Sequence, residues 1–183
     1  MSEFALVSKP ALADRAPIAG KDITLEALPE GHVILIMGKP GDDTIKNRIV
    51  PLSDCTPHAV RAAAPGQWFM VGDQPKTQGQ LEALFAALGT DVYGVDQSAG
   101  RVRIHLCGGG AESVLAKGTA VDLAMISFPV AWATTTLIGH ISTHITRTGE
   151  HAFELMVLRG FAESLWDDLV QMSLEFQQFP RPN

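Results

Sequence analysis

The sequence predicts an α+β fold with a ferredoxin-like split β-α-β core, an N-terminal hairpin and a C-terminal docking helix. Two observations favour this class. From about residue 68 the pattern runs strand, helix, strand, strand, helix, strand, which is the split β-α-β order, and one more strand and a last helix follow. With 183 residues, of which 46% are hydrophobic, the chain is long enough for one well-buried domain.

The N-terminal part predicts an arm and two strands. Residues 1–20 are rich in Ala and Pro and lack a periodic pattern, which is typical of an extended arm, so a single domain is expected over residues 21–183. Residues 22–28 and 32–38 have the composition of strands. They flank Pro29-Glu30-Gly31, which predicts a hairpin.

The first helix of the core has a clear start and end. Residues 39–57 predict a loop with at most a helical turn near Thr44, and residues 68–72 predict a short strand. A helix then begins at Thr77, because Thr77 and Gln80 have the spacing of a capping box. Its expected buried positions are Leu81, Leu84, Phe85 and Leu88, and Gly89 is expected to end it.

Residues 91–97 and 101–107 predict a second hairpin with its turn at Ser98-Ala99-Gly100. In the second strand, apolar and polar side chains alternate, so the apolar trio is expected to face the core. The apolar positions are Val102, Ile104 and Leu106, and the polar ones are Arg101, Arg103, His105 and Cys107.

The C-terminal half predicts two helices and two strands. Residues 111–118 predict a helix with Ala111, Val114 and Leu115 on one face. The β-branched run 134–147 predicts one strand that pairs with residues 151–158. The last segment predicts a docking helix whose apolar face carries Phe161, Leu165, Trp166, Leu169, Met172 and Phe176.

Charge and composition exclude several classes of partner. The formal net charge is -6 and no run of basic residues exceeds a dipeptide, so nucleic acid is not expected as a partner. Cys55 and Cys107 lack C-x-x-C spacing, which fits a reduced cytoplasmic protein. We expect no secretory signal, and no membrane association, because the longest uncharged stretch, residues 123–139, falls short of the ~20 apolar residues of a spanning helix.

Three successive glycines, Gly108 to Gly110, raise the question of a phosphate site between a strand and a helix. A P-loop needs lysine directly after its last glycine, whereas Lys117 precedes Gly118. A dinucleotide fingerprint would need glycine where Ser113 stands. The favoured interpretation is a tight turn that lets the helix start close to the sheet, and phosphate binding is the minor alternative.

No catalytic, cofactor-binding or metal-ligating residue is predicted. His140 and His144 are four residues apart, and on a strand that spacing separates them by about 13 Å, too far to share an ion. No serine has the G-x-S-x-G pattern of a hydrolase nucleophile, and neither cysteine has a histidine in a pattern that suggests a thiol nucleophile.

Residues 123–133 form an uncharged connection between the second predicted core helix and the next strand. Such a composition is unusual for a loop, because loops run over the surface where their backbone groups find water. We expect Phe128, Pro129 and Trp132 to form an apolar patch that a partner protein covers. The alternative is that part of this run covers the chain's own sheet.

Residues 101–137 and 153–171 resemble the gamma subunit of heterotetrameric sarcosine oxidases, and the resemblance extends from Pro65 to the end of the chain. The most specific matches are VLAKG at 114–118, Asp122-Leu123, Phe128-Pro129, Arg159-Gly160-Phe161-Ala162 and Leu165-Trp166. The chain departs from that family near Ala131, where the family usually has glycine, near Gly160, where it usually has serine, and over residues 39–57.

The resemblance implies a shortened relative of the folate-binding domain of aminomethyltransferases. It implies a non-catalytic gamma subunit of a flavin-dependent complex that oxidatively demethylates sarcosine or a related N-methyl amino acid. It further implies alpha, beta and delta subunits as partners, with FAD, FMN, NAD and tetrahydrofolate held by other subunits and no cofactor in this chain. The alternatives are a stand-alone folate-binding or methylene-transfer protein and a homo-oligomeric binding module, and self-association of the isolated chain is left open.

Overall fold

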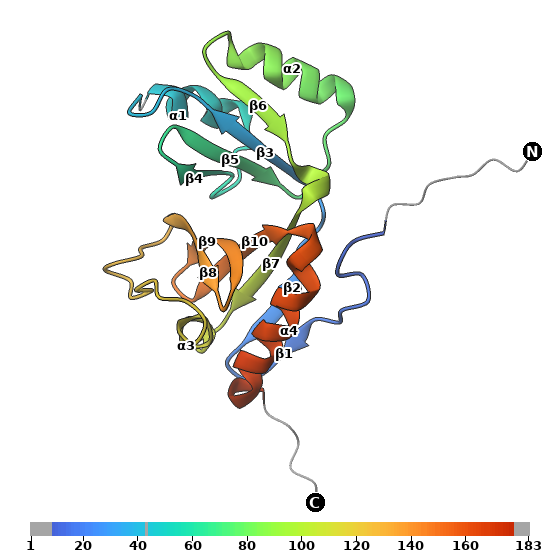
Figure 1. The fold of residues 1–183 in the computed structure, drawn as a ribbon, viewed down its shortest axis with the longest axis vertical. Helices are drawn as coiled ribbons and strands as arrows, with labels where there is room; N and C mark the ends of the chain where they lie inside the picture. The colour runs from blue at the N-terminus through green and yellow to red at the C-terminus, as the bar shows by residue number, and fades with distance from the viewer. Residues whose placement is uncertain (1–8, 43, 178–183) are drawn as a thin grey trace, which may run out of the picture.

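The computed structural model describes residues 9–42 and 44–177, and these residues form four layers. Two antiparallel sheets lie face to face, and helices cover the outer face of each sheet. Figure 1 shows α1 (Thr44–Ile49) and α2 (Gln78–Leu88) at one end of the molecule and α3 (Ala111–Ala116) and α4 (Ala162–Ser173) at the other. In the described part of the chain, no helix has the length and apolar character needed to cross a bilayer.

The six-stranded sheet carries the larger core. Its strands in spatial order are β1 (Ile18–Ala19), β2 (Thr24–Ala27), β7 (Arg101–Cys107), β10 (Ala152–Leu158), β9 (Ile141–Gly149) and β8 (Ala133–Ile138). Val102, Ile104 and Leu106 are buried in one cluster with the apolar residues of α3 and α4, which confirms the prediction for this strand.

The C-terminal helix docks on this sheet, as predicted, through the buried side chains of Leu165, Trp166 and Leu169. Met172 and Phe176 are partly buried against the same cluster. Phe161 is 52% exposed, so its predicted burial is wrong. It lies in the 3-10 turn η3 (Arg159–Phe161) that precedes α4, and its side chain therefore falls off the apolar face of the helix.

The four-stranded sheet has the β-α-β-β-α-β order of the ferredoxin-like motif. Its elements along the chain are β3 (His32–Met37), α1, β4 (Val60–Ala64), β5 (Gln67–Gly72), α2 and β6 (Tyr93–Asp96). β3 and β4 are parallel with β5 between them, and β5 and β6 are parallel with β3 between them. The split motif therefore occupies residues 32–96, and its predicted position from residue 68 onward is wrong.

The predicted N-terminal hairpin does not form, because β2 and β3 belong to different sheets. The backbone N–H of Leu28 donates to the Arg103 carbonyl at 2.9 Å, so the chain stays beside β7 up to this point. It then crosses to the other sheet at Gly31, where a Cβ atom would lie 2.0 Å from the Gly72 carbonyl oxygen. Only glycine lets the chain pass so close to the end of β5.

The predicted hairpin of residues 91–107 is wrong for a similar reason. The N–H of Gln97 donates to the Val33 carbonyl at 2.8 Å, so the end of this strand stays with β3. Residues 98–100 form the 3-10 turn η2, and the chain then enters β7 in the six-stranded sheet. Alternating apolar residues indicate which face of a strand is buried, but they do not identify its neighbour.

The predicted strand over residues 134–147 is two strands, β8 and β9, which pair with each other, and only β9 also pairs with β10. Gly139 has a φ of 58°, and Gly139-His140 forms the turn between the paired residues Ile138 and Ile141. A positive φ at this glycine allows a tight two-residue connection in the middle of the β-branched run. The pairing of residues 151–158 with this region is confirmed for β9.

The predicted helix start at Thr77 is confirmed in detail. The N–H of Gln80 donates to Thr77 Oγ1 at 3.3 Å, and the N–H of Thr77 donates to Gln80 Oε1 at 2.8 Å. Leu81, Leu84 and Leu88 are buried against the four-stranded sheet, with Phe85 partly buried beside them. Gly89 ends the helix with a φ of 86°.

The part of the predicted arm that the structure describes lies against the six-stranded sheet. Leu12 is buried in the core of that sheet. The N–H of Ala11 donates to Glu30 at 2.7 Å, and Arg15 pairs with Asp167 of α4 at 3.1 Å. Residues 1–8 lie outside the described residues, and the division into an arm and a single domain over residues 21–183 stays a prediction.

The layer between the two sheets is unusually polar. Its apolar part is the small cluster of Val33, Phe69, Val71 and Met156. Beside this cluster, the Arg61 guanidinium donates two hydrogen bonds to the Glu154 carboxylate at 2.6 and 2.8 Å, joining β4 to β10. His144 of β9 donates from Nε2 to the Ala62 carbonyl at 2.9 Å and meets the Phe69 ring edge-on at 5.1 Å. Buried polar groups thus join the sheets.

Burial of His144 between the sheets has a consequence for stability. Loss of solvation lowers the pKa of His144 from its ordinary 6.5 to about 4, although the hydrogen bond to the Ala62 carbonyl acts in the opposite direction. The unfolded chain therefore binds a proton at His144 between these two pH values while the folded chain does not. Protonation of the unfolded chain favours unfolding. The stabilisation that His144 provides is therefore fully present above pH 6.5 and is lost as the pH falls toward 4.

We expect His144→Gln to make stability less dependent on pH, because glutamine can donate to the same carbonyl but does not titrate. Between pH 7 and 4.5, His144 in the unsubstituted chain should account for a loss of about 2 to 3 kcal/mol. Denaturant unfolding at both pH values measures the difference. His140→Gln, at the exposed turn of the same hairpin, is the control, and equal pH dependence in all three proteins would contradict the assignment.

Candidate functional site: an exposed apolar loop

The connection from α3 to β8 is an ordered loop. The N–H groups of Ser127 and Phe128 both donate to the Ala124 carbonyl at 2.8 Å, and the N–H of Trp132 donates to the Pro129 carbonyl at 3.0 Å. The Ala131 N–H donates to the Arg147 carbonyl at 2.9 Å, which ties the end of the loop to β9. These bonds fix which side chains the loop presents to solvent.

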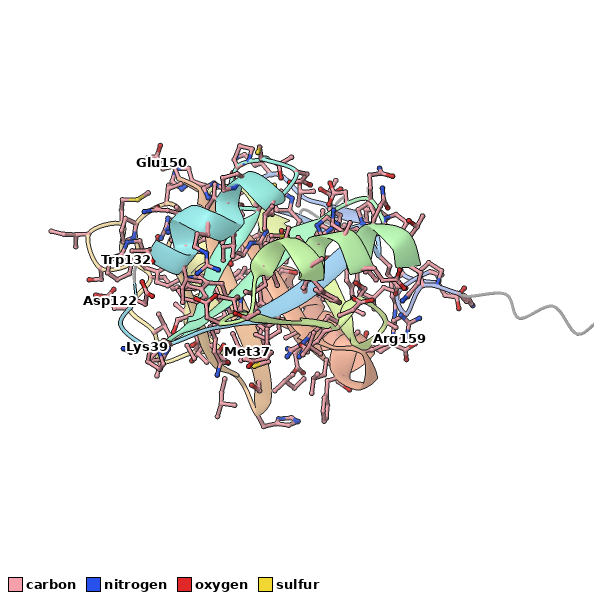
Figure 2. The ribbon with its side chains drawn as sticks, turned by 90° about the horizontal axis from the view of Figure 1, so that it is seen from above. Met37, Lys39, Asp122, Trp132, Glu150 and Arg159 are labelled. Atoms are coloured by element: carbon pink, nitrogen blue, oxygen red, sulfur yellow. The ribbon has the colours of Figure 1, made fainter. Side chains whose placement is uncertain are left out.

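Four apolar side chains of this loop are exposed, and we call them the apolar loop surface. They are Met125 at 39%, Ile126 at 93%, Val130 at 40% and Trp132 at 58% exposure. Figure 2 shows Trp132 and Asp122 at one edge of the molecule and Arg159 on the opposite side. An exposed cluster of this kind is typical of a contact site for another protein.

The three residues that the sequence predicts for a partner interface have different environments. Trp132 is exposed, Pro129 is half-buried, and Phe128 is 3% exposed and belongs to the core of the six-stranded sheet. The sequence prediction did not include Met125, Ile126 and Val130, although they lie in the same uncharged run. Which residues of this run point outward depends on the turn at Ala124, which has no clear signal in the sequence.

A buried arginine supports the base of the loop. Arg147 of β9 is 1% exposed and lies over the Phe153 ring, with 4.5 Å between the guanidinium carbon and the ring centroid. It donates to the carbonyls of Leu123 and Glu150 and pairs with Glu112 of α3 at 3.2 Å. The hydrogen bond from Arg147 to the Leu123 carbonyl therefore holds the first residues of the loop to the sheet.

Ala131 is in the left-handed region, with a φ of 73°. This conformation costs a residue with a Cβ atom roughly 1 kcal/mol, whereas glycine adopts it freely. At this position the chain turns from the loop into β8, directly before the exposed Trp132 leads into the strand. The turn persists because the hydrogen bonds between this segment and Arg147 hold both of its sides.

The glycine run forms an architectural turn at the start of α3. The N–H groups of Gly108 and Gly110 donate to the carbonyls of His151 and Asp22, both at 2.9 Å, so these donors are already satisfied. A Cβ atom on Gly108 would lie 2.3 Å from the Asp22 carbonyl oxygen, and one on Gly110 would lie 2.6 Å from the Phe176 ring. The favoured interpretation, a tight turn that starts α3 close to the sheet, is confirmed.

We expect Gly108→Ala to lower the free energy of unfolding by about 2 kcal/mol or more, because its φ of 116° and the nearby Asp22 carbonyl both oppose a side chain. Gly109→Ala in the same run should change it by no more than about 0.5 kcal/mol, because no atom lies within 4 Å of a Cβ there. Denaturant unfolding tests both. Equal losses in the two variants would show that the glycines are not distinguished by these contacts.

His140 and His144 occupy different environments, the first exposed at the turn and the second buried between the sheets. Across residues 9–42 and 44–177, no three His, Cys, Asp or Glu side chains are grouped so that they could hold a metal ion. Cys55 is exposed and Cys107 partly buried, and both are free thiols. We take the apolar loop surface as the candidate functional site.

The sequence matches the model of the sarcosine oxidase, gamma subunit family over residues 49–175. This match covers more than half of the chain and includes α3, the apolar loop surface and all of α4. No curated protein matches the sequence significantly.

Solved structures share the fold at low sequence identity. A chain of heterotetrameric sarcosine oxidase from Corynebacterium sp. U-96, in complex with pyrrole 2-carboxylate, is similar with a TM-score of 0.79 and 23% identity, over 96% of this chain and 99% of that chain. The glycine cleavage system aminomethyltransferase T from Bartonella henselae is similar with a TM-score of 0.60 and 18% identity. That match covers 81% of this chain but only 45% of the aminomethyltransferase.

Proposed function

The chain belongs to the sarcosine oxidase gamma subunit family, and we propose that it is a non-catalytic subunit of a flavin-dependent sarcosine oxidase-like complex. Such a complex oxidatively demethylates sarcosine or a related N-methyl amino acid. The alpha, beta and delta subunits are the partners in this proposal, and FAD, FMN, NAD and tetrahydrofolate are held by the alpha and beta subunits. The similarity to a chain of a heterotetrameric sarcosine oxidase supports an assembly of this kind.

The observation that carries the proposal is the apolar loop surface. Ile126 is 93% exposed and Trp132 is 58% exposed, yet the backbone that presents them is fixed by hydrogen bonds to the sheet. A rigid loop loses little conformational entropy on binding, so more of the energy from covering apolar area is available as affinity. We therefore assign this surface to contact with another subunit of the complex, with Trp132 as its central anchor.

Trp132→Ala should weaken assembly without unfolding the chain, because its side chain is largely outside the core. Aromatic anchors at interfaces typically cost ~2 kcal/mol or more when truncated, which is at least about tenfold in affinity. The measurement is the yield of complex after co-expression with the alpha, beta and delta subunits, together with the melting temperature of the isolated chain.

Tyr93→Ala is the matched control, because Tyr93 is an aromatic side chain that is 66% exposed on β6 of the other sheet. It should leave assembly unchanged. Equal yields of complex from both variants would show that Trp132 is not part of the interface. A large fall in the melting temperature of Trp132→Ala would show that its role is in folding.

The isolated chain should be colourless and should not bind tetrahydrofolate tightly, because the proposal places the cofactors on other subunits. Absorbance between roughly 350 and 500 nm would detect bound flavin through the ring system of this cofactor. Calorimetric titration with tetrahydrofolate tests the alternative of a stand-alone folate-binding protein. Stoichiometric flavin, or saturable folate binding by this chain alone, would favour a catalytic or folate-binding role over the proposed one.

A further inference from the structure

A pocket of about 340 Å³ opens where the two sheets meet, away from the apolar loop surface. Both sheets and the connections between them contribute to its wall. The lining residues used below are Asp54, Arg61, Asp73, Arg103 and Glu154, and apolar side chains such as Leu28 and Val71 complete the wall. Its volume is near the lower end of the range for small-molecule sites in proteins.

The floor of this pocket contains more buried positive charge than buried negative charge. The side chains of Arg61 and Arg103 are 4% and 5% exposed, and that of Glu154 is 6% exposed. Both oxygens of Glu154 accept hydrogen bonds from Arg61. Two guanidinium groups therefore share one buried carboxylate.

Arg103 has a hydrogen-bond donor that is not used. Its Nη2 donates to the carbonyls of Pro29 and Gly72, both at 3.2 Å, and to Asp73 at 2.5 Å. Its Nη1 lies 3.7 Å from Glu154, beyond hydrogen-bonding distance, and donates no hydrogen bond to another described residue. The Asp73 side chain is 59% exposed, so solvent screens much of its charge.

These charges define the chemistry of a ligand. A carboxylate would supply the missing buried negative charge at Arg103 Nη1, and its planar shape suits a guanidinium edge. A phosphate dianion would bring too much charge, because Glu154, Asp54 and Asp73 already line the pocket. The two aspartates are exposed residues of the wall and attract a cation. A small molecule with both a carboxylate and an ammonium group can pair with Arg103 and with the two aspartates.

We propose that this pocket binds a small amino acid, with its carboxylate on Arg103 and its amine toward Asp54 and Asp73. Short apolar substituents, including an N-methyl group, would contact Leu28 and Val71 in the wall. The inference concerns the isolated chain and does not depend on the proposed subunit role. A binding site here would give the chain a ligand of its own, remote from the surface assigned to other subunits.

The test is calorimetric titration of the isolated full chain with glycine and with sarcosine, and with acetate and methylamine as single-charge probes. Glycine and sarcosine should bind saturably, and each single-charge probe should bind at least tenfold more weakly. Absence of saturable binding by both amino acids would overturn the proposal. Equal binding of acetate and glycine would also overturn it, because the pocket would then be a general anion site.

Two variants locate the ligand. Arg103→Lys should weaken glycine binding at least tenfold, because lysine lacks the planar guanidinium whose Nη1 is proposed to meet the carboxylate. Arg101→Lys is the control, because Arg101 lies two residues away on β7 and is partly buried, but does not line this pocket. Equal weakening by both would contradict the assignment.

Asp73→Asn tests the orientation of the amino acid even if Arg103→Lys destabilises the fold, because the side chain of Asp73 is largely exposed. This variant should reduce the preference for glycine over acetate at least fivefold, since it removes a partner of the ammonium group but not of the carboxylate. An unchanged preference would overturn the predicted orientation of the amino acid.

Discussion

The ion pair between Arg61 and Glu154 joins the two sheets, and much of the structure depends on it. Both side chains are about 5% exposed, and both oxygens of the carboxylate are bonded to the guanidinium. Loss of one partner would leave an uncompensated buried charge, which typically costs about 3–5 kcal/mol. The pair therefore fixes where β4 meets β10. That placement in turn positions Arg103 and the pocket beside it, because Arg103 reaches from β7 to the end of β5.

A second buried arginine has a comparable role on the opposite face of the six-stranded sheet. Arg147 is held by the carbonyls of Leu123 and Glu150 and by Glu112, and it anchors the start of the exposed loop. Because the loop is fixed at its base and through Ala131, its exposed side chains cannot fold back onto the core. The same constraint explains the left-handed conformation at Ala131.

Local signals in the sequence predict the helices well. The capping box at Thr77, the glycine at position 89 and the apolar faces of α2 and α4 all correspond to features of the structure. These signals are local because a helix satisfies most of its hydrogen bonds within itself. Most strands are also identified, but β1 and β4 are not, and the turn at Gly139 divides the single strand predicted over residues 134–147.

The pairing of the strands could not be predicted, because strand partners are set by contacts between distant residues. Both wrong hairpins lie at positions where the chain crosses from one sheet to the other, at Gly31 and at residues 98–100. The same crossing explains Arg103, which alternation assigns to the polar face of β7. That face is buried by the second sheet, so the arginine is 5% exposed. The uncharged run identified the loop correctly, but not the inward orientation of Phe128.

The central claim is that this chain contributes to a larger complex through its apolar loop surface. Amide hydrogen exchange of the chain alone and of the purified assembly with its partner subunits tests it most directly. The account predicts slower exchange in the assembly at residues 125–132, with little change at Gly108 and Gly110, whose amides are already bonded internally. Unchanged exchange over residues 125–132 in an assembled complex, with slower exchange only elsewhere, would contradict it.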